Sequence, residues 1–281
     1  MAENTALTTP NRSIDVGGDT FAYRRLGSPG TTPPLVMLQH FRGNLDFWDP
    51  DLLDALAADR EVITVDLRGV GGSSGATRTS VWEDALDVVA FVDALGLETV
   101  DLFGFSLGGH VAQDVVLARP RLVRRLVLGG TAPMGAPGLH RWNDDVYAYA
   151  TGDETSADDF VALFFSGSAS STALAWEHLR RRSARTEADV PTSLAARDAQ
   201  LVALTAWGIP DRSRLERLSA ITQPTLVLCG DDDTMMVTAN SVRLADAIPG
   251  AQLRVYPDAG HGFLDQLPVL VAEHVRLFLG R

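Results

Sequence analysis

The sequence contains no lysine: its 24 basic residues are all arginine, against 36 acidic residues. The absence of a lysine amine excludes a Walker A phosphate loop, a Schiff base and a serine–lysine catalytic pair. With a formal net charge of −12, the chain also lacks the clustered cations that bind nucleic acid or anionic membranes, so we expect neither as a partner. Its one basic block, HLRRRSAR at 178–185, is predicted to be a solvated helix face.

Cysteine and long apolar runs are also scarce. The one cysteine, Cys229, cannot form a disulfide within the chain, which agrees with a reducing compartment. No apolar run reaches the roughly 18 residues that a membrane-spanning helix needs. The first residues, MAENTALTTPNRS, lack the basic and then apolar regions of a secretion signal. From these absences we expect a cytoplasmic protein.

Short apolar runs rich in Val, Leu and Ile recur along the chain and predict strands that are covered on both faces. Between them lie helical patterns, and strand alternating with helix is typical of a mostly parallel sheet. Two alternating runs around Gly17-Gly18 predict an antiparallel hairpin at one sheet edge. We therefore predict an α/β fold with a mostly parallel, doubly wound sheet of about eight strands. The apolar runs are 34–40, 61–67, 99–105, 124–130, 225–230 and 252–258, and the most regular helical pattern runs from Val81 to Leu95.

The alternation stops at residue 134 and resumes near residue 214. The intervening stretch is rich in aromatic residues and has helical patterns without an evident strand. We predict that residues 134–213 form a helical cap inserted into an α/β core made of 1–133 and 214–281. Aromatic side chains of such a cap either pack among its helices or line an apolar substrate pocket. The cap residues considered for that pocket are Trp142, Phe164 and Trp207.

A serine stands between two glycines in the stretch DLFGFSLGGH, residues 101–110. It follows a predicted buried strand and opens a predicted helix. In this strand-turn-helix setting a serine sits on a strained turn with its hydroxyl exposed, as a nucleophile requires. The helix N-terminus also favours negative charge nearby. We therefore expect Ser106 to be a nucleophile rather than an ordinary turn residue.

A serine hydroxyl needs a base, usually a histidine oriented by a carboxylate. Of the six histidines, only His261 stands in a loop directly after the last predicted strand, between two glycines. The acid should follow the preceding strand, where LCGDDD offers three adjacent aspartates. A Ca²⁺ loop would need a glycine and a later glutamate at fixed spacing, and both are missing. We favour Asp233 as the acid, with Asp231 as the alternative.

Several motifs together resemble the α/β-hydrolase superfamily over the whole chain except the cap. GFSLGG resembles its nucleophile elbow, VDLRGVGGSSG its D-x-R-G-x-G-x-S turn, LCGDDD its acid turn and DAGHGF its histidine loop. The resemblance implies that Ser106, Asp233 and His261 form a catalytic triad. We expect neither metal nor cofactor, since the glycine run 69–75 has Ser74 where a dinucleotide fingerprint needs glycine.

The superfamily commonly has H-G-x-x-G after its third strand, where this chain has QHFRG at 39–43. Aligned on the last glycine, the resemblance implies an oxyanion hole made by the backbone N–H groups of Phe41 and Leu107; a shift by one residue would replace Phe41 with Arg42. The Arg42 side chain can grip a substrate carboxylate or, as we favour, point into solvent or pair with Asp46. His40 and Arg42 complete the candidate pocket residues.

These residues predict a metal-free and cofactor-free serine hydrolase that cleaves a small-molecule carboxylic ester or lactone through an acyl-enzyme intermediate. The aromatic cap and the acidic surface favour an apolar, uncharged or cationic substrate. A cofactor-free haloperoxidase or perhydrolase, or a C–C bond hydrolase, would use the same triad. A receptor that binds its ligand on the same fold is a further alternative, and turnover would distinguish it.

Overall fold

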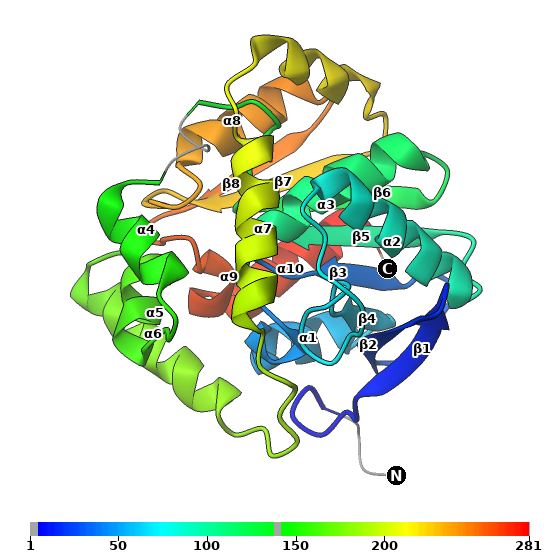
Figure 1. Cartoon of the computed structure of the whole chain (residues 1–281), viewed down its shortest axis with the longest axis horizontal. Coiled ribbons are helices and arrows are strands. Elements are labelled where there is room, and N and C mark those ends of the chain that lie inside the picture. Colours follow the sequence, from blue (N-terminus) through cyan, green and yellow to red (C-terminus); the bar gives the residue numbers. More distant parts are fainter. Residues whose placement is uncertain (1–4, 138–141, 281) are drawn as a thin grey trace.

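The computed structural model describes residues 5–137 and 142–280, and a single eight-stranded sheet forms their centre (Figure 1). The strand order is β1-β2-β4-β3-β5-β6-β7-β8. Strands β3 to β8 run parallel, whereas β1 and β2 form a hairpin that joins β4 antiparallel. This confirms the predicted α/β fold. The strands are β1 (Arg12–Val16), β2 (Asp19–Leu26), β3 (Leu35–Leu38), β4 (Val62–Val65), β5 (Val100–Phe105), β6 (Val123–Gly129), β7 (Thr225–Gly230) and β8 (Gln252–Tyr256).

The apolar runs of the sequence coincide with the parallel strands. Every residue of β3, β4, β5 and β7 is buried, because helices cover both faces of the sheet. The hairpin turn at Gly17 and Gly18 has φ values of 65° and 94°, the left-handed conformations that a tight two-residue turn requires and glycine tolerates.

Helices flank the sheet on opposite sides. The chain steps one way from β3 to β4 through α1 (Pro50–Ala57) and the other way to β5 and β6 through α2 (Val81–Ala94) and α3 (Leu107–Ala118). Because such crossovers are right-handed, α1 covers one face while α2 and α3 cover the other. Accordingly, α1 packs against α10 (Pro268–Leu279), and α2 packs against α3. The connection from β7 to β8 contains α8 (Thr238–Ala247).

The stretch between β6 and β7 is helical, as its sequence indicates. It contains α4 (Asp144–Thr151), α5 (Ala157–Phe164), α6 (Ala169–Arg182), α7 (Leu194–Trp207) and the 3₁₀ helix η2 (Arg212–Ala220). In Figure 1, α4, α5 and α6 gather at one side of the molecule and α7 crosses in front of the sheet. The described residues between 134 and 213 include no strand. The division into core and cap stays a prediction, and residues 138–141 of that stretch lie outside the described part.

The described helices include none that is both long enough and apolar enough to cross a lipid bilayer.

The loops that leave the carboxyl ends of the parallel strands meet at one edge of the sheet. The direction of winding changes where β3 lies beside β5, which is the position where open α/β sheets form their sites. The loops after β3, β5, β7 and β8 carry residues 39–43, Ser106, Asp233 and His261, respectively.

Candidate active site

Ser106 lies on a strained turn between β5 and α3. Its φ of 55° and ψ of −117° fall in a region that side-chain-bearing residues rarely occupy. Neighbouring glycines allow the turn: a Cβ on Gly108 would lie 2.2 Å from the carbonyl oxygen of Leu38 in β3. The Ser106 N–H donates to the Gly129 carbonyl at 2.8 Å, and the Thr131 hydroxyl donates to the Ser106 carbonyl at 2.8 Å. These contacts hold the serine backbone in place.

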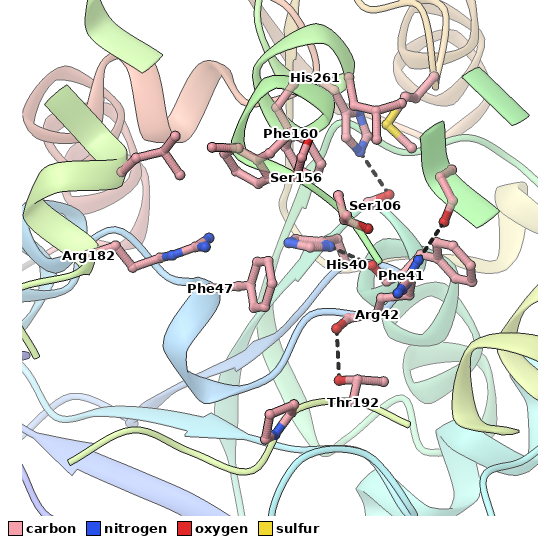
Figure 2. Close-up of a pocket in the computed structure, with 18 residues that line it drawn as sticks. His40, Phe41, Arg42, Phe47, Ser106, Ser156, Phe160, Arg182, Thr192 and His261 are labelled. Atoms are coloured by element: carbon pink, nitrogen blue, oxygen red, sulfur yellow. Dashed lines mark hydrogen bonds between the residues drawn. The ribbon is translucent and has the colours of Figure 1, made fainter. Parts of the chain in front are cut away.

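The structure brings the three predicted triad side chains together in a hydrogen-bonded chain, of which Figure 2 shows the contact between Ser106 and His261. His261 Nε2 lies 2.9 Å from Ser106 Oγ, and His261 Nδ1 lies 2.7 Å from Asp233 Oδ2. The other oxygen of Asp233 accepts the backbone N–H groups of Met235 and Met236 at 2.9 and 2.8 Å. The carboxylate is thus oriented to accept the Nδ1 proton, which leaves Nε2 as the acceptor for the serine hydroxyl.

Asp231, the alternative acid, makes no hydrogen bond with the His261 ring among the described residues. Its side chain is exposed and accepts the backbone N–H of Ala259 at 3.3 Å, whereas Asp233 is buried against His261. Asp233 is therefore the carboxylate that the fold presents to the imidazole.

The two backbone N–H groups predicted for the oxyanion hole have no partner in the part of the chain that the structure describes. Within the described residues, neither Phe41 nor Leu107 has an acceptor for its backbone N–H. Arg42, the alternative donor, is already engaged, because its N–H donates to Gln200 Oε1 at 2.8 Å. The N–H of Gly108 donates to the Gln39 carbonyl at 3.0 Å and so fastens the Ser106 turn to the loop after β3.

A cavity of about 370 Å³, of a size typical of small-molecule sites, lies over Ser106 and His261. Its walls are mostly apolar. The neutral His40 ring forms part of them, since burial lowers the pKa of His40 to about 3. Its Nδ1 donates to the Phe41 carbonyl at 2.7 Å, and its ring packs edge-on against Phe164 of α5.

Three of the five predicted pocket residues, His40, Arg42 and Phe164, line this cavity, but Trp142 and Trp207 do not. Both tryptophans are buried, and their indole N–H groups donate to the carbonyls of Met235 and Ala132, each at 3.2 Å. Their rings therefore pack within the protein. Sequence reasoning missed Phe47 and Arg182 as lining residues, because which face of an element meets the cavity is set by tertiary packing.

The Arg42 side chain neither points into solvent nor pairs with Asp46. Its Nη1 donates to the carbonyls of Ala150 and Gly152 at 3.1 and 2.7 Å, where α4 ends. Thr192 donates its hydroxyl to the Arg42 carbonyl at 2.8 Å (Figure 2). Arg42 thus ties the loop after β3 to the segments that precede and follow α6, and its Nη1 is occupied by backbone carbonyls.

The basic block 178–185 is not a solvated helix face. His178 is buried, Arg181 donates to Asp49, Arg182 lines the cavity, and Arg185 donates to the carbonyl of Ala6 at 2.8 Å. Positions 178, 181 and 182 are three and four residues apart, so they share the helix face that meets the core.

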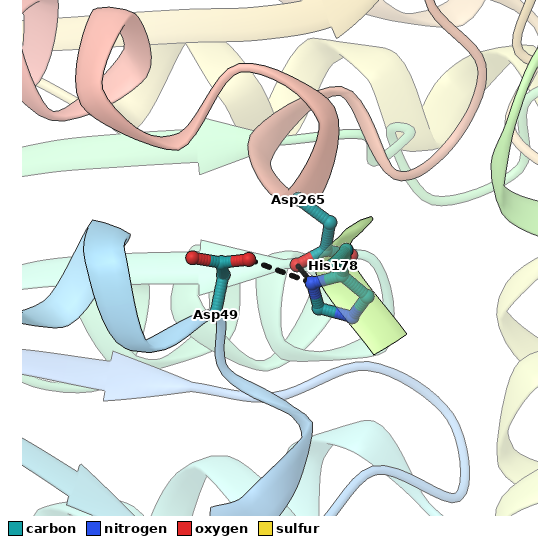
Figure 3. Close-up of side chains that lie close together, drawn as sticks. All are labelled: Asp49, His178 and Asp265. Carbon is teal, nitrogen blue, oxygen red and sulfur yellow. Dashed lines mark hydrogen bonds and ion pairs between the residues drawn. The ribbon is translucent and has the colours of Figure 1, made fainter. Parts of the chain in front are cut away.

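A second group of titratable side chains, Asp49, His178 and Asp265, lies buried between α6 and the core (Figure 3). Their ligand-type atoms lie within 4.8 Å of one another, as in a metal site. However, His178 Nδ1 and Arg181 Nη2 each lie 2.7 Å from Asp49 Oδ2 and already occupy that oxygen. Burial opposes ionisation of Asp49, but these donors outweigh it and lower its pKa, whereas burial raises the pKa of Asp265 to about 6. We interpret the group as a set of structural contacts that attach α6 to the core.

The sheet order, the turn at Ser106 and the loops that converge on it define an α/β hydrolase. The sequence model of the alpha/beta hydrolase fold family matches residues 33–266, and the chain belongs to that family. A solved alpha/beta hydrolase fold protein from Chitinophaga pinensis is 38% identical, with a TM-score of 0.92, over 98% of this chain and 99% of that chain.

Two curated relatives are similar over most of their length. A poly(3-hydroxyalkanoate) depolymerase of Ectopseudomonas oleovorans is 31% identical over 91% of this chain and 87% of its own. RutD of Agrobacterium fabrum, which is named for carbamate hydrolysis, is 29% identical over 88% of this chain and 93% of its own.

Proposed function

We propose that this chain is a serine hydrolase that cleaves an ester or lactone bond of a small molecule through an acyl-enzyme intermediate. The observation that supports this most directly is the continuous hydrogen-bonded chain from Ser106 through His261 to Asp233 at the wall of a cavity. Each of the three side chains is buried, so the hydrogen bonds between them are shielded from competing water.

The geometry supports the following sequence of steps. His261 Nε2 accepts the proton of the Ser106 hydroxyl while Oγ attacks the substrate carbonyl carbon. Asp233 keeps the imidazole in the tautomer with Nδ1 protonated and stabilises the imidazolium that forms. The imidazolium then donates its proton to the leaving alcohol, which leaves an ester on Ser106. Water, deprotonated by the same imidazole, attacks this ester, and the imidazolium returns that proton to Ser106 Oγ as the acid is released.

The developing oxyanion needs donors that are not otherwise engaged. We assign this role to the backbone N–H groups of Phe41 and Leu107, because no described acceptor competes for them and that of Arg42 is taken by Gln200. Loss of one such donor lowers the rate about 10²- to 10³-fold in enzymes of this kind.

A carbamate is the second candidate substrate, favoured by the similarity to RutD. Its carbonyl would be attacked by the same serine. Perhydrolase chemistry and C–C bond cleavage would also use this triad, so assays with acetate and peroxide and with a diketone belong beside the ester and carbamate assays.

Covalent labelling tests the proposal. A fluorophosphonate should label the wild type at Ser106 and should not label Ser106→Ala, whose turnover of p-nitrophenyl esters should fall about 10⁴-fold or more. Ser219→Ala is a matched control because Ser219 is exposed and only donates to the carbonyl of Glu216. Mass spectrometry of the adduct identifies the residue, and labelling elsewhere would contradict the assignment.

A further inference from the structure

Among the described residues that line the cavity over Ser106, one arginine has a buried donor atom without a hydrogen-bond partner. The described lining of the cavity includes no aspartate or glutamate and two arginines, Arg42 and Arg182. The Arg42 guanidinium is bound to backbone carbonyls, and the low pKa of His40 keeps that ring neutral. Although the chain has a net charge of −12, the inside of the cavity is therefore positive.

Arg182, the last residue of α6, lies between two aromatic rings. Its guanidinium carbon is 4.2 Å from the ring centre of Phe47 and 5.1 Å from that of Phe160. Figure 2 shows the guanidinium pointing from α6 into the cavity, toward His40. Its Nη1 is buried and has no hydrogen-bond partner among the described residues. A buried guanidinium nitrogen without an acceptor is unfavourable, and a bound anion would supply that acceptor.

The neighbouring carboxylates do not accept a hydrogen bond from Arg182 within the described residues. Asp46, Asp49 and Asp265 act on Arg182 only through space, and no hydrogen bond or ion pair joins any of them to it within the described residues. Burial lowers the pKa of Arg182, but an arginine keeps its charge at any ordinary pH. Meanwhile the contacts of His178 and Arg181 with Asp49 hold α6 against the core, so the guanidinium is kept at the cavity wall.

We propose that Arg182 binds a carboxylate of the substrate, so that the preferred ester or lactone carries a carboxylate group apart from its scissile bond. This inference depends on the proposed hydrolase function and names its substrate class. A planar guanidinium gives a carboxylate two parallel hydrogen bonds, and the aromatic rings at Arg182 would exclude water from them. The acidic composition of the chain favours an uncharged substrate. A bound molecule, however, contacts the cavity wall, where the charge is positive.

Pairs of esters that differ only in one charge test the proposal. The first pair is mono-p-nitrophenyl adipate, whose carboxylate lies in the acyl part, and its methyl ester. The second pair is 4-acetoxybenzoate, whose carboxylate lies in the alcohol part, and methyl 4-acetoxybenzoate. The wild type should show a kcat/KM at least about 30-fold higher for the acidic member of one pair. A wild type that treats both pairs alike, or prefers both neutral members, overturns the proposal.

Variants at position 182 test whether Arg182 causes the preference for the acidic ester. Arg182→Met keeps the length of the side chain and should abolish the preference for the acidic ester, whereas Arg182→Lys keeps the charge and should retain most of that preference. Arg180→Met is the matched control, since Arg180 lies on the exposed face of α6. A preference that survives in Arg182→Met refutes the role of Arg182.

The two proposals fail in different ways. Fluorophosphonate labelling of Ser106 and hydrolysis of the neutral esters, without a preference for the acid, would overturn only the role of Arg182. Absence of labelling and of all hydrolysis would overturn the hydrolase function and this inference together. If Arg182→Met does not fold, the comparison of the paired esters in the wild type and in Arg182→Lys still tests the proposal.

Discussion

Gly108 shows how closely single residues are constrained around Ser106. The turn brings α3 so near to β3 that a Cβ at this position would lie 2.2 Å from the carbonyl oxygen of Leu38 and 2.8 Å from that of Gln39. Both obstacles are backbone atoms, which cannot move without displacing the strand or the loop that supplies the Phe41 N–H. The absence of a side chain here is therefore a condition for the geometry at Ser106.

We predict that Gly108→Ala loses both stability and fluorophosphonate labelling. Overpacking of this kind costs about 1–3 kcal/mol, and displacement of α3 would move Ser106 Oγ away from His261. Thermal unfolding and the labelling rate measure the two effects. Gly167→Ala is the matched control, because nothing lies within 4 Å of a Cβ there, and an equal loss in both variants would contradict the explanation.

At the scale of the element, α2 carries a buried carboxylate without a partner. Asp84 is 1% exposed, and neither of its side-chain oxygens has a hydrogen-bond partner among the described residues. Burial, with a further contribution from the charge of Asp87, raises the pKa of Asp84 from 3.8 to about 8. Asp87 on the same helix is the opposite case: burial opposes its ionisation, but hydrogen bonds from Arg78 and Arg68 lower its pKa.

The contribution of Asp84 to the stability of the protein should therefore fall as the pH rises from about 4 to about 8. Over this range the unfolded chain ionises Asp84 while the folded protein keeps it protonated, so each pH unit lowers the free energy of unfolding by about 1.4 kcal/mol. Asp84→Asn should remove this contribution. Denaturant unfolding at pH 5 and at pH 7.5 measures it as the difference in slope between the two proteins.

Asp93→Asn provides the control on the same helix. Asp93 is half exposed and pairs with the exposed Arg119, so its replacement should leave the pH dependence as in the wild type. If the stabilities of Asp84→Asn and the wild type change in parallel between these two pH values, Asp84 does not make the predicted contribution.

At the scale of the whole molecule, Arg42 connects the loop after β3 with the helical stretch between β6 and β7. Its side chain binds carbonyls at the end of α4, its N–H binds Gln200 of α7, and its carbonyl accepts from Thr192. The same short loop also carries Phe41, the proposed oxyanion donor. The position of the helices over the cavity and the shape of the oxyanion hole are therefore linked through one residue.

We predict that Arg42→Met loosens α4 and α5 without loosening the sheet. Only the side-chain bonds to the carbonyls are lost, since the backbone bonds of residue 42 remain and methionine meets the same positive φ of 63°. Hydrogen exchange should become faster in residues 144–164 and stay unchanged in β5. Arg119→Met, which removes an exposed ion pair, is the control. Equal acceleration in β5 would contradict the predicted division into core and cap.

Local patterns carried most of the information about the sheet and about Ser106, His261 and Asp233. Apolar runs of strand length predict buried parallel strands, and the carboxyl ends of parallel strands meet at one edge, so the loops that follow them converge. The serine between glycines at a strand-to-helix junction is likewise a local signal. These inferences rested on the order of elements along the chain, and the resemblance to α/β hydrolases also selected Asp233 among three adjacent aspartates.

The lining of the cavity was decided by the tertiary structure. Arg180, Arg181 and Arg182 are alike in sequence, but each step along a helix turns the side chain by about 100°, so one lies in solvent, one meets Asp49 and one enters the cavity. Similarly, Trp142 and Trp207 pack inward while Phe47 faces the cavity. The sequence by itself determined the strands and the turn that carries the serine. Which arginine faces the substrate depends on how α6 is rotated against the core, and only contacts between distant residues set that rotation.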